Sequence, residues 1–191
     1  VTGCMAQRYK EEITEEIPEV DAVLGTTSYG DIVKALNEAE AGHVFREFKD
    51  INALPEDSGR RVITTGGHFG YLKIAEGCDK HCTYCIIPSL RGKFRSVPEE
   101  RLLKQAEYMA SQGVRELILV AQETTVYGTD LYGKKTLHIL LKKLCQIKGI
   151  RWIRVLYCYP EEIYDELIQV MKEEKKICHY LDLPIQHASD R

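Results

Sequence analysis

Residues 71–92 read YLKIAEGCDKHCTYCIIPSLRG and join a short apolar run to three closely spaced cysteines. We expect a strand over 71–75, followed directly by Cys78, Cys82 and Cys85 in a CxxxCxxC spacing. Three thiolates this close on one loop can surround a single metal centre, and cysteine thiolates hold iron–sulfur clusters, usually four to a cluster. Three ligands leave one iron open for chemistry. The spacing therefore predicts an iron–sulfur cluster with an open iron.

Two non-catalytic interpretations of the same cysteines stay open at this point. Structural zinc favours paired CxxC or Cys/His sets, but His81 lies between the cysteines and no second CxxC pair follows. An electron-carrier cluster needs a fourth cysteine nearby. The next one, Cys145, falls in an expected helix and fits a small core residue better. A metal-stabilised or electron-transfer module is thus the alternative to an enzyme.

Downstream of the cysteines, apolar strands alternate with helical patterns. Strands are expected at 71–75, 116–121, 152–157 and 179–184, and helices at 98–113, 136–147 and 160–174. This alternation implies an α/β fold with a parallel sheet. Four such units fit either half of a doubly wound sheet or most of a barrel. In parallel βα folds the functional groups lie on loops after the strands, which is where the cysteine loop falls.

The N-terminal part is expected to be a smaller α/β unit. A strand ends at residues 3–4, a helix covers 5–17, a short strand covers 22–25, and a second helix runs from Ser28 or Asp31 to about 41. Residues 42–68 have no sustained period and read as a linker, with short edge strands expected at 44–45 and 62–63. The predicted division is therefore 1–41, 42–68 and 69–191. Because the chain begins at Val1 within a strand pattern, we expect it to be an internal piece of a longer protein.

Composition excludes several classes of protein. The 191 residues are 44% hydrophobic and 29% charged with a net charge of −3, so no general field attracts nucleic acid. The longest apolar runs, such as 117–121, are far shorter than the roughly 18 residues of a membrane span. Seven cysteines, an odd number without a secretory signal, argue against a disulfide framework. We expect a cytoplasmic protein that does not bind membranes.

The cysteine loop, with Tyr84 just before its third cysteine, resembles the signature of the radical S-adenosylmethionine (SAM) superfamily. More narrowly, the chain resembles the methylthiotransferases of the RimO type, over essentially its whole length. The tRNA-modifying MiaB type usually has other residues in several of the matching segments. These segments are GCMAQ at 3–7, CIIPSLRG at 85–92, AQETTVYG at 121–128, YCYP at 157–160 and PIQHAS at 184–189.

The resemblance implies a fold and a chemistry. The fold is part of an N-terminal, Rossmann-like methylthiotransferase domain followed by an incomplete radical SAM partial TIM barrel. Cys78, Cys82 and Cys85 would bind a four-iron, four-sulfur cluster, and SAM would chelate its open iron. An electron donor would drive SAM cleavage to a deoxyadenosyl radical, which removes hydrogen from the β-carbon of an aspartate in ribosomal protein twelve of the small subunit. Cys4 would be one of three ligands to a second such cluster that supplies the methylthio group; a tRNA substrate is the alternative.

Further candidate residues lie near the expected strand ends. Gln122 and Glu123 follow the second strand, and Gln186 and His187 follow the fourth, where they could line the SAM pocket or serve only as ordinary loop residues. Tyr84 would shield the cluster or pack near adenine. The basic run Arg91, Lys93 and Arg95 is expected to be a solvated loop, with attraction for the SAM carboxylate or an anionic substrate as the alternative.

Overall fold

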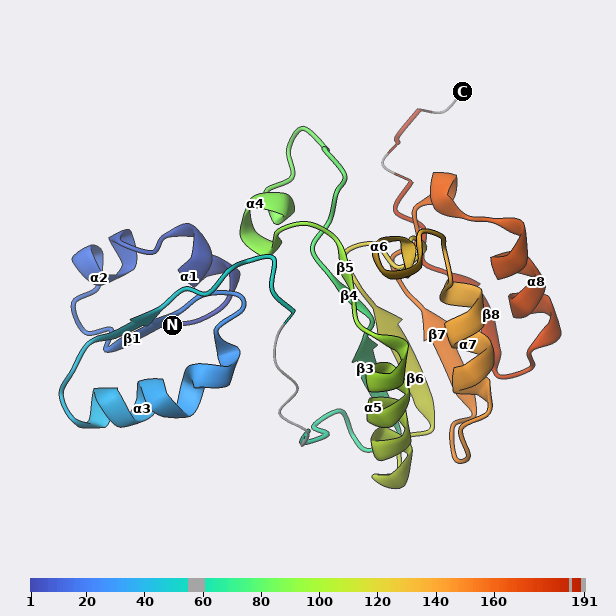
Figure 1. Ribbon diagram of the computed structural model, residues 1–191, viewed down its shortest axis with the longest axis horizontal. Coiled ribbons are helices and arrows are strands. Elements are labelled where there is room, and N and C mark those ends of the chain that lie inside the picture. The colour runs from blue at the N-terminus through green and yellow to red at the C-terminus, as the bar shows by residue number, and fades with distance from the viewer. Residues whose placement is uncertain (55–60, 186, 190–191) are drawn as a thin grey trace. The chain divides into compact units, whose positions relative to one another are not determined.

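The computed structural model describes residues 1–54, 61–185 and 187–189 of the chain (Figure 1). It consists of two compact units that interleave along the sequence. The first is made of the described residues of 1–59 and 77–93, and the second of those of 60–76 and 94–191. The cysteine loop therefore groups with the N-terminal residues, whereas the strands on either side of it belong to the second unit.

The first unit is built on a small parallel sheet. Strand β1 (Ala22–Leu24) pairs in parallel with β2 (Phe45–Glu47), and Thr2 forms a parallel bridge to Leu24 on the other side. The helices of the first 54 residues are α1 (Cys4–Arg8), α2 (Glu12–Glu16), the short 3-10 helix η1 (Tyr29–Asp31) and α3 (Ile32–Glu40). Ala6, Ile13 and Val23 form the centre of the small core.

Two features of this unit differ from the sequence-based expectation. The helix predicted over 5–17 is broken into α1 and α2 by a turn at residues 9–11. The second difference is β2, which lies within the predicted linker. The edge strand expected at 44–45 overlaps β2 at Phe45, whereas residues 62–63 form no strand. The first unit extends past residue 41.

The second unit contains a four-stranded parallel sheet in the order β3-β6-β7-β8. Its strands are β3 (Phe69–Lys73), β6 (Glu116–Val120), β7 (Trp152–Val155) and β8 (Ile177–Leu181). Each strand pairs with the next one along the chain, and the order never reverses. A doubly wound sheet reverses its order only between its two halves, so this order fits both a barrel wall and half of a doubly wound sheet.

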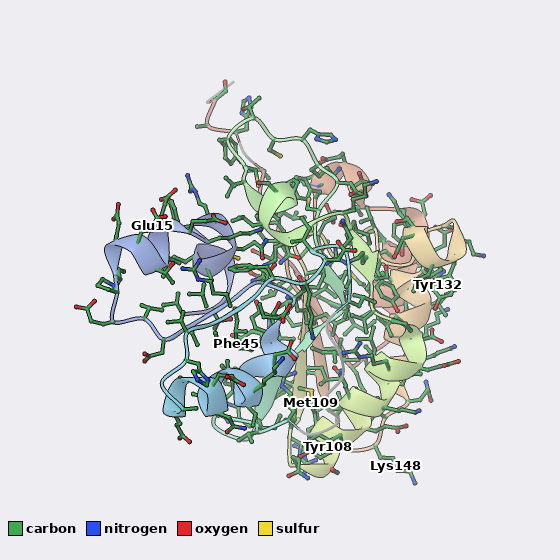
Figure 2. All side chains as sticks on the ribbon, turned by 60° about the vertical axis from the view of Figure 1, so that its left-hand side comes forward. Glu15, Phe45, Tyr108, Met109, Tyr132 and Lys148 are labelled. Atoms are coloured by element: carbon green, nitrogen blue, oxygen red, sulfur yellow. The ribbon has the colours of Figure 1, made fainter. Side chains whose placement is uncertain are left out.

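Helices α5 (Glu99–Ser111), α7 (Leu137–Cys145) and α8 (Asp165–Glu173) connect successive strands. In Figure 1, α5 and α7 lie in front of the sheet. The strand residues that alternate toward one face are buried, among them Leu72, Leu119 and Val155, which lie side by side in the strand register. Met109 of α5, labelled in Figure 2, fits against Gly70 of β3, where an added Cβ would lie 2.4 Å from its Cε. The apolar faces of these strands and of α5 are thus buried in the second unit.

Several short elements were not expected. The strand predicted over 71–75 is divided, because Ala75–Glu76 forms a separate strand β4 that pairs antiparallel with β5 (Arg95–Ser96). Helices α4 (Ile87–Arg91) and α6 (Thr129–Tyr132) lie within predicted loops. Pro160 opens only the 3-10 turn η2 (Pro160–Glu162), and α8 starts later. Across the described residues, every helix is too short or too polar to cross a bilayer.

Candidate cluster and cofactor site

The cysteine loop is closed at its base by backbone contacts within the first unit. The Cys78 N–H donates to the Gly92 carbonyl at 3.2 Å. Gly77 has φ 75°, and a Cβ added to it would lie 2.1 Å from the Lys93 oxygen and 2.5 Å from the Gly92 oxygen. Only glycine has room for so close an approach in a left-handed conformation. The sequence Gly-Cys thus places the first cysteine at the neck of the loop.

The three predicted ligands lie on this one loop but differ in exposure. Cys78 is buried, and its sulfur accepts the Lys80 N–H at 3.4 Å, whereas Cys82 and Cys85 are half-buried. The Cys85 N–H donates to the Cys82 carbonyl at 3.0 Å, which folds the last two cysteines into a turn. A hollow of about 350 Å³ opens beside Cys78 and is lined by other residues of the same loop.

The loop sulfurs are not drawn together in this conformation. Within the described ranges, no three His, Cys, Asp or Glu side chains gather closely enough to hold a metal ion. The donor chemistry nevertheless fits an iron–sulfur cluster, because three thiols on one short loop are soft ligands and cysteine thiolates are the usual cluster ligands.

Helix α4 seats the end of the cysteine loop on the N-terminal residues of the same unit. The Thr26 hydroxyl donates to the Leu90 carbonyl at 2.8 Å, and the Lys93 N–H donates to the Asn52 side chain at 3.0 Å. The Arg91 Nε–H donates to the Cys4 sulfur at 3.2 Å. Arg91 is half-buried, so the expectation of a solvated basic loop is wrong at this position. The fold brings Cys4 beside the cysteine loop's helix, 87 residues away in sequence.

The three remaining cysteines are packed thiols of the second unit. Burial raises the pKa of Cys145 and of Cys158 to about 11, and it also raises the pKa of the half-buried Cys178. A thiol with a raised pKa is a poor nucleophile and a poor ligand at neutral pH. The expectation that Cys145 is a core residue is confirmed, since it is buried at the end of α7.

In the second unit, the segment after β6 is held by its own hydrogen bonds. Glu123 is buried, and its carboxylate accepts the N–H of Thr125 at 2.9 Å and the Thr125 hydroxyl. The Thr124 hydroxyl lies 2.8 Å from the carbonyl oxygens of Leu156 and Tyr157 after β7. Glu123 therefore has a structural role here. By contrast, the buried Gln122 Oε1 has no hydrogen-bond partner among the described residues.

A strained residue at the end of β7 was not predicted from the sequence. Tyr157 has φ 62°, a left-handed conformation that is unfavourable for a residue with a Cβ. Its N–H donates to the Asp182 carboxylate at 3.1 Å, and the Cys158 N–H donates to the Asp182 carbonyl at 2.8 Å. Such strain concentrates at functional sites. No local pattern indicated it, and Asp182 falls inside the strand predicted over 179–184.

The other predicted residues are less defined by the structure. Tyr84 is 74% exposed. The exposed His187 accepts the Ser189 N–H at Nδ1, at 3.1 Å. Gln186 lies outside the described residues.

Comparison with known proteins decides the family. The model of the radical SAM superfamily matches residues 72–191, from β3 through the cysteine loop and all four strands. The chain belongs to the radical SAM superfamily. The sequence resemblance is thereby confirmed at the level of the superfamily.

Curated relatives are more specific. The chain is 65% identical over 190 residues to the "Ribosomal protein uS12 methylthiotransferase RimO" of Lachnoclostridium phytofermentans and 53% identical to the protein of the same name from Clostridioides difficile. Each match covers all of this chain and 43% of the relative. The chain therefore spans less than half the length of these relatives.

A solved structure supports the fold of this radical SAM chain. The radical SAM methyltransferase TsrM from Kitasatospora setae, bound to tryptophan and a SAM analogue, matches with a TM-score of 0.51 at 15% identity. The match covers 65% of this chain and 23% of TsrM. At this identity the likeness shows the α/β fold alone.

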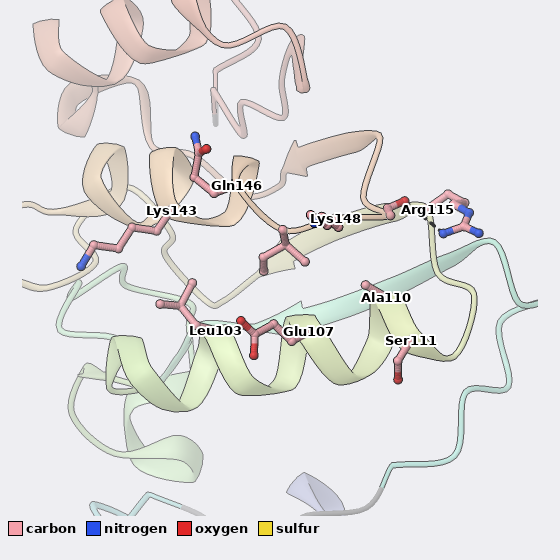
Figure 3. Close-up of a pocket in the computed structure, with 10 residues that line it drawn as sticks. Leu103, Glu107, Ala110, Ser111, Arg115, Lys143, Gln146 and Lys148 are labelled. Atoms are coloured by element: carbon pink, nitrogen blue, oxygen red, sulfur yellow. Dashed lines mark hydrogen bonds between the residues drawn. The ribbon is translucent and has the colours of Figure 1, made fainter.

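A second hollow of about 740 Å³ lies between α5 and α7 (Figure 3). Its lining includes Leu103 and Glu107 of α5 and the loop residues Arg115 and Gly149, which precede β6 and β7. This places it near the N-terminal ends of the strands, whereas radical SAM chemistry in a βα barrel wall belongs at the opposite ends. None of the predicted site residues lines it, so the larger hollow is not the candidate site.

Proposed function

We propose that this chain forms part of a radical SAM methylthiotransferase that adds a methylthio group to the β-carbon of an aspartate in ribosomal protein uS12. The observation that carries the proposal is 65% identity across the whole chain to a uS12 methylthiotransferase. The cysteine loop of the superfamily lies within that match. A ribosomal substrate would place the protein in the cytoplasm.

In this proposal, Cys78, Cys82 and Cys85 hold a four-iron, four-sulfur cluster and leave its fourth iron to the amino and carboxylate groups of SAM. When bound, the cluster and SAM supply one-electron cleavage of SAM, which needs an external electron donor and yields the radical that takes hydrogen from the substrate. The chain would bind and orient the cluster and SAM, and it would exclude competing reactions. The buried neck at Cys78 limits access of water to one side of the centre.

Residues after the strands of the second unit would bind SAM. Gln122 is the best placed chemically, because its buried oxygen can accept a hydrogen bond from an ammonium group. Glu123 would act indirectly, by fixing the turn through Thr125. The sequence positions also support three further residues as SAM contacts: Tyr84, Gln186 and His187.

Cys4 is proposed as one ligand of a second, auxiliary four-iron, four-sulfur cluster that donates the methylthio group. The N-terminal residues would then belong to a partial methylthiotransferase domain of Rossmann-like architecture, joined to the radical SAM core that we predict over 69–191. The parallel pairing of Thr2, β1 and β2 with α3 between the two strands is consistent with such a domain.

The cluster assignment is tested by anaerobic reconstitution of the complete protein with iron and sulfide. Cys82→Ala should lower the iron content and the visible absorption that come from the SAM-binding cluster. Cys4→Ala should lower the iron content that comes from the auxiliary cluster and leave the SAM-binding cluster in place. Cys145→Ala is the matched control, since it removes a buried core thiol. Full iron content in Cys82→Ala would contradict the radical SAM cluster and favour the alternative of a metal-stabilised or electron-transfer module.

The substrate is tested with the reconstituted complete enzyme, SAM and a reductant. Ribosomes and tRNA from a strain lacking the enzyme are incubated separately and analysed by mass spectrometry. A methylthio mass increase on a uS12 aspartate is expected. An increase on tRNA with none on uS12 would overturn the proposed substrate in favour of the MiaB type.

A further inference from the structure

Arg91 joins the two cysteine motifs of the first unit. Its Nε–H donates a hydrogen bond of 3.2 Å to the sulfur of Cys4. Arg91 ends helix α4, which closes the radical SAM cysteine loop, and Cys4 begins helix α1. A guanidinium is always protonated and can only donate, so this contact places a positive charge and an N–H donor beside the Cys4 sulfur.

We propose that Arg91 is a positioning residue for the auxiliary cluster: it fixes the Cys4 sulfur and raises the reduction potential of the cluster that this sulfur ligates. The inference rests on the proposed function, in which Cys4 is a cluster ligand. It assigns Arg91 to the auxiliary cluster, although in sequence it belongs to the loop of the SAM cluster.

The position of Arg91 is set by contacts that do not involve either cluster. The Leu90 carbonyl accepts the buried Thr26 hydroxyl at 2.8 Å, and the Lys93 N–H is bound by Asn52 at 3.0 Å. These bonds hold the residues before and after Arg91 on the N-terminal part of the unit. The guanidinium is therefore presented to Cys4 by a fixed backbone, which limits the entropy lost when it binds sulfur.

The redox consequence follows from charge. Reduction adds an electron to the cluster and increases the negative charge on its sulfur ligands. A hydrogen bond from a cation stabilises the reduced state more than the oxidised state, and hydrogen bonds to cluster sulfurs are one of the factors that set the reduction potential. Loss of the Arg91 bond should therefore make the auxiliary cluster harder to reduce.

The test uses the complete protein with Cys78, Cys82 and Cys85 all replaced by alanine, so that only the auxiliary cluster is reconstituted. Its midpoint potential is measured by redox titration with electron paramagnetic resonance. Arg91→Gln should shift the ratio of reduced to oxidised cluster about tenfold toward oxidised at a fixed potential, a decrease of about 59 mV for one electron. Arg8→Gln is the matched control, because exposed Arg8 ends the same helix α1 and its recorded contact is with the Tyr9 ring.

The outcomes separate this inference from the proposed function. If the auxiliary cluster does not form, or forms equally well with Cys4→Ala, the assignment of Cys4 fails. If the cluster depends on Cys4 but Arg91→Gln and Arg8→Gln have the same potential as the parent, the inference about Arg91 is overturned. Should Arg91→Gln fail to fold, Arg91→Met is titrated instead; it keeps a long side chain but has neither the charge nor the N–H donors, and an unchanged potential again overturns the inference.

Discussion

Gly77 and Lys93 approach so closely that a Cβ on Gly77 would lie 2.1 Å from the Lys93 carbonyl oxygen. We predict that Gly77→Ala opens the neck of the cysteine loop, because the backbone of residues 92–93 has to move. The left-handed φ of 75° adds about 1–2 kcal/mol of strain for alanine. Iron content after reconstitution should fall by more than half, and the free energy of unfolding in urea should fall by more than the strain alone.

Gly42→Ala is the control for this experiment. Gly42 has a similar φ of 80°, but an added Cβ would meet nothing within 4 Å. It should lose about 1 kcal/mol of stability and keep its full iron content. Equal losses in the two variants would mean that conformational strain, and not the contact with Lys93, governs the neck.

The thiols should differ in reactivity in the metal-free chain. Burial raises the pKa of Cys145 and Cys158 to about 11, so at pH 8 only about one molecule in a thousand carries the thiolate at either position. Their alkylation rate should rise about tenfold per pH unit until pH approaches 11. Half-buried Cys82 and Cys85 should be alkylated first at pH 8, as measured by mass spectrometry of labelled peptides. Labelling of Cys158 ahead of Cys82 would contradict the described packing.

Local patterns in the sequence predicted most of the second unit. Apolar periodicity located the four parallel strands and their helices within a few residues, because each element is specified by its own buried face. The cysteine spacing was also recognisable, because all three thiols lie on one short segment of the sequence. What periodicity could not provide was the strand order, which depends on pairing and which the structure alone resolved as β3-β6-β7-β8.

Features that depend on contacts distant in sequence were missed. The bond from Arg91 to Cys4 spans 87 residues, and no local pattern distinguishes Arg91 from a solvated basic residue. The β4–β5 ribbon joins residues 75–76 to 95–96 across the cysteine loop. The two-residue strands are too short to show any period. The left-handed Tyr157 was equally hidden, because a tyrosine carries no sequence signal for positive φ.

The left-handed conformation of Tyr157 can be tested by the sign of the stability difference between a glycine and an alanine variant. Tyr157→Gly and Tyr157→Ala both remove the ring and differ only in the Cβ. Glycine is expected to be more stable by about 0.5–1 kcal/mol, because alanine keeps the strain of φ 62°. At Tyr180, an exposed position within strand β8, alanine should be the more stable substitution, as is usual for a strand. Urea unfolding of the four variants measures both differences; the same order at both positions would contradict the left-handed conformation.

Asp130 and Ser96 couple the start of α6 to strand β5 in the second unit. The Asp130 carboxylate accepts the Ser96 N–H at 2.9 Å and the Ser96 hydroxyl at 2.6 Å, and the Ser96 hydroxyl oxygen accepts the Gly128 N–H at 2.9 Å. Ser96 is fully buried, so removing its acceptor leaves buried donors unpaired, which costs about 1–3 kcal/mol. Asp130→Ala should therefore lower the free energy of unfolding by about 2 kcal/mol.

A double-mutant cycle distinguishes this bond from a general effect of charge. Ser96→Ala alone should also destabilise, and the double variant should lose about 1 kcal/mol less than the sum of the single losses, because the two substitutions remove the same hydroxyl–carboxylate bond. Asp165→Ala is the control, since Asp165 is an exposed acid in the first turn of α8 and its removal should lower stability by only a few tenths of a kcal/mol. Additive losses at Ser96 and Asp130 would show that the two side chains do not interact in solution.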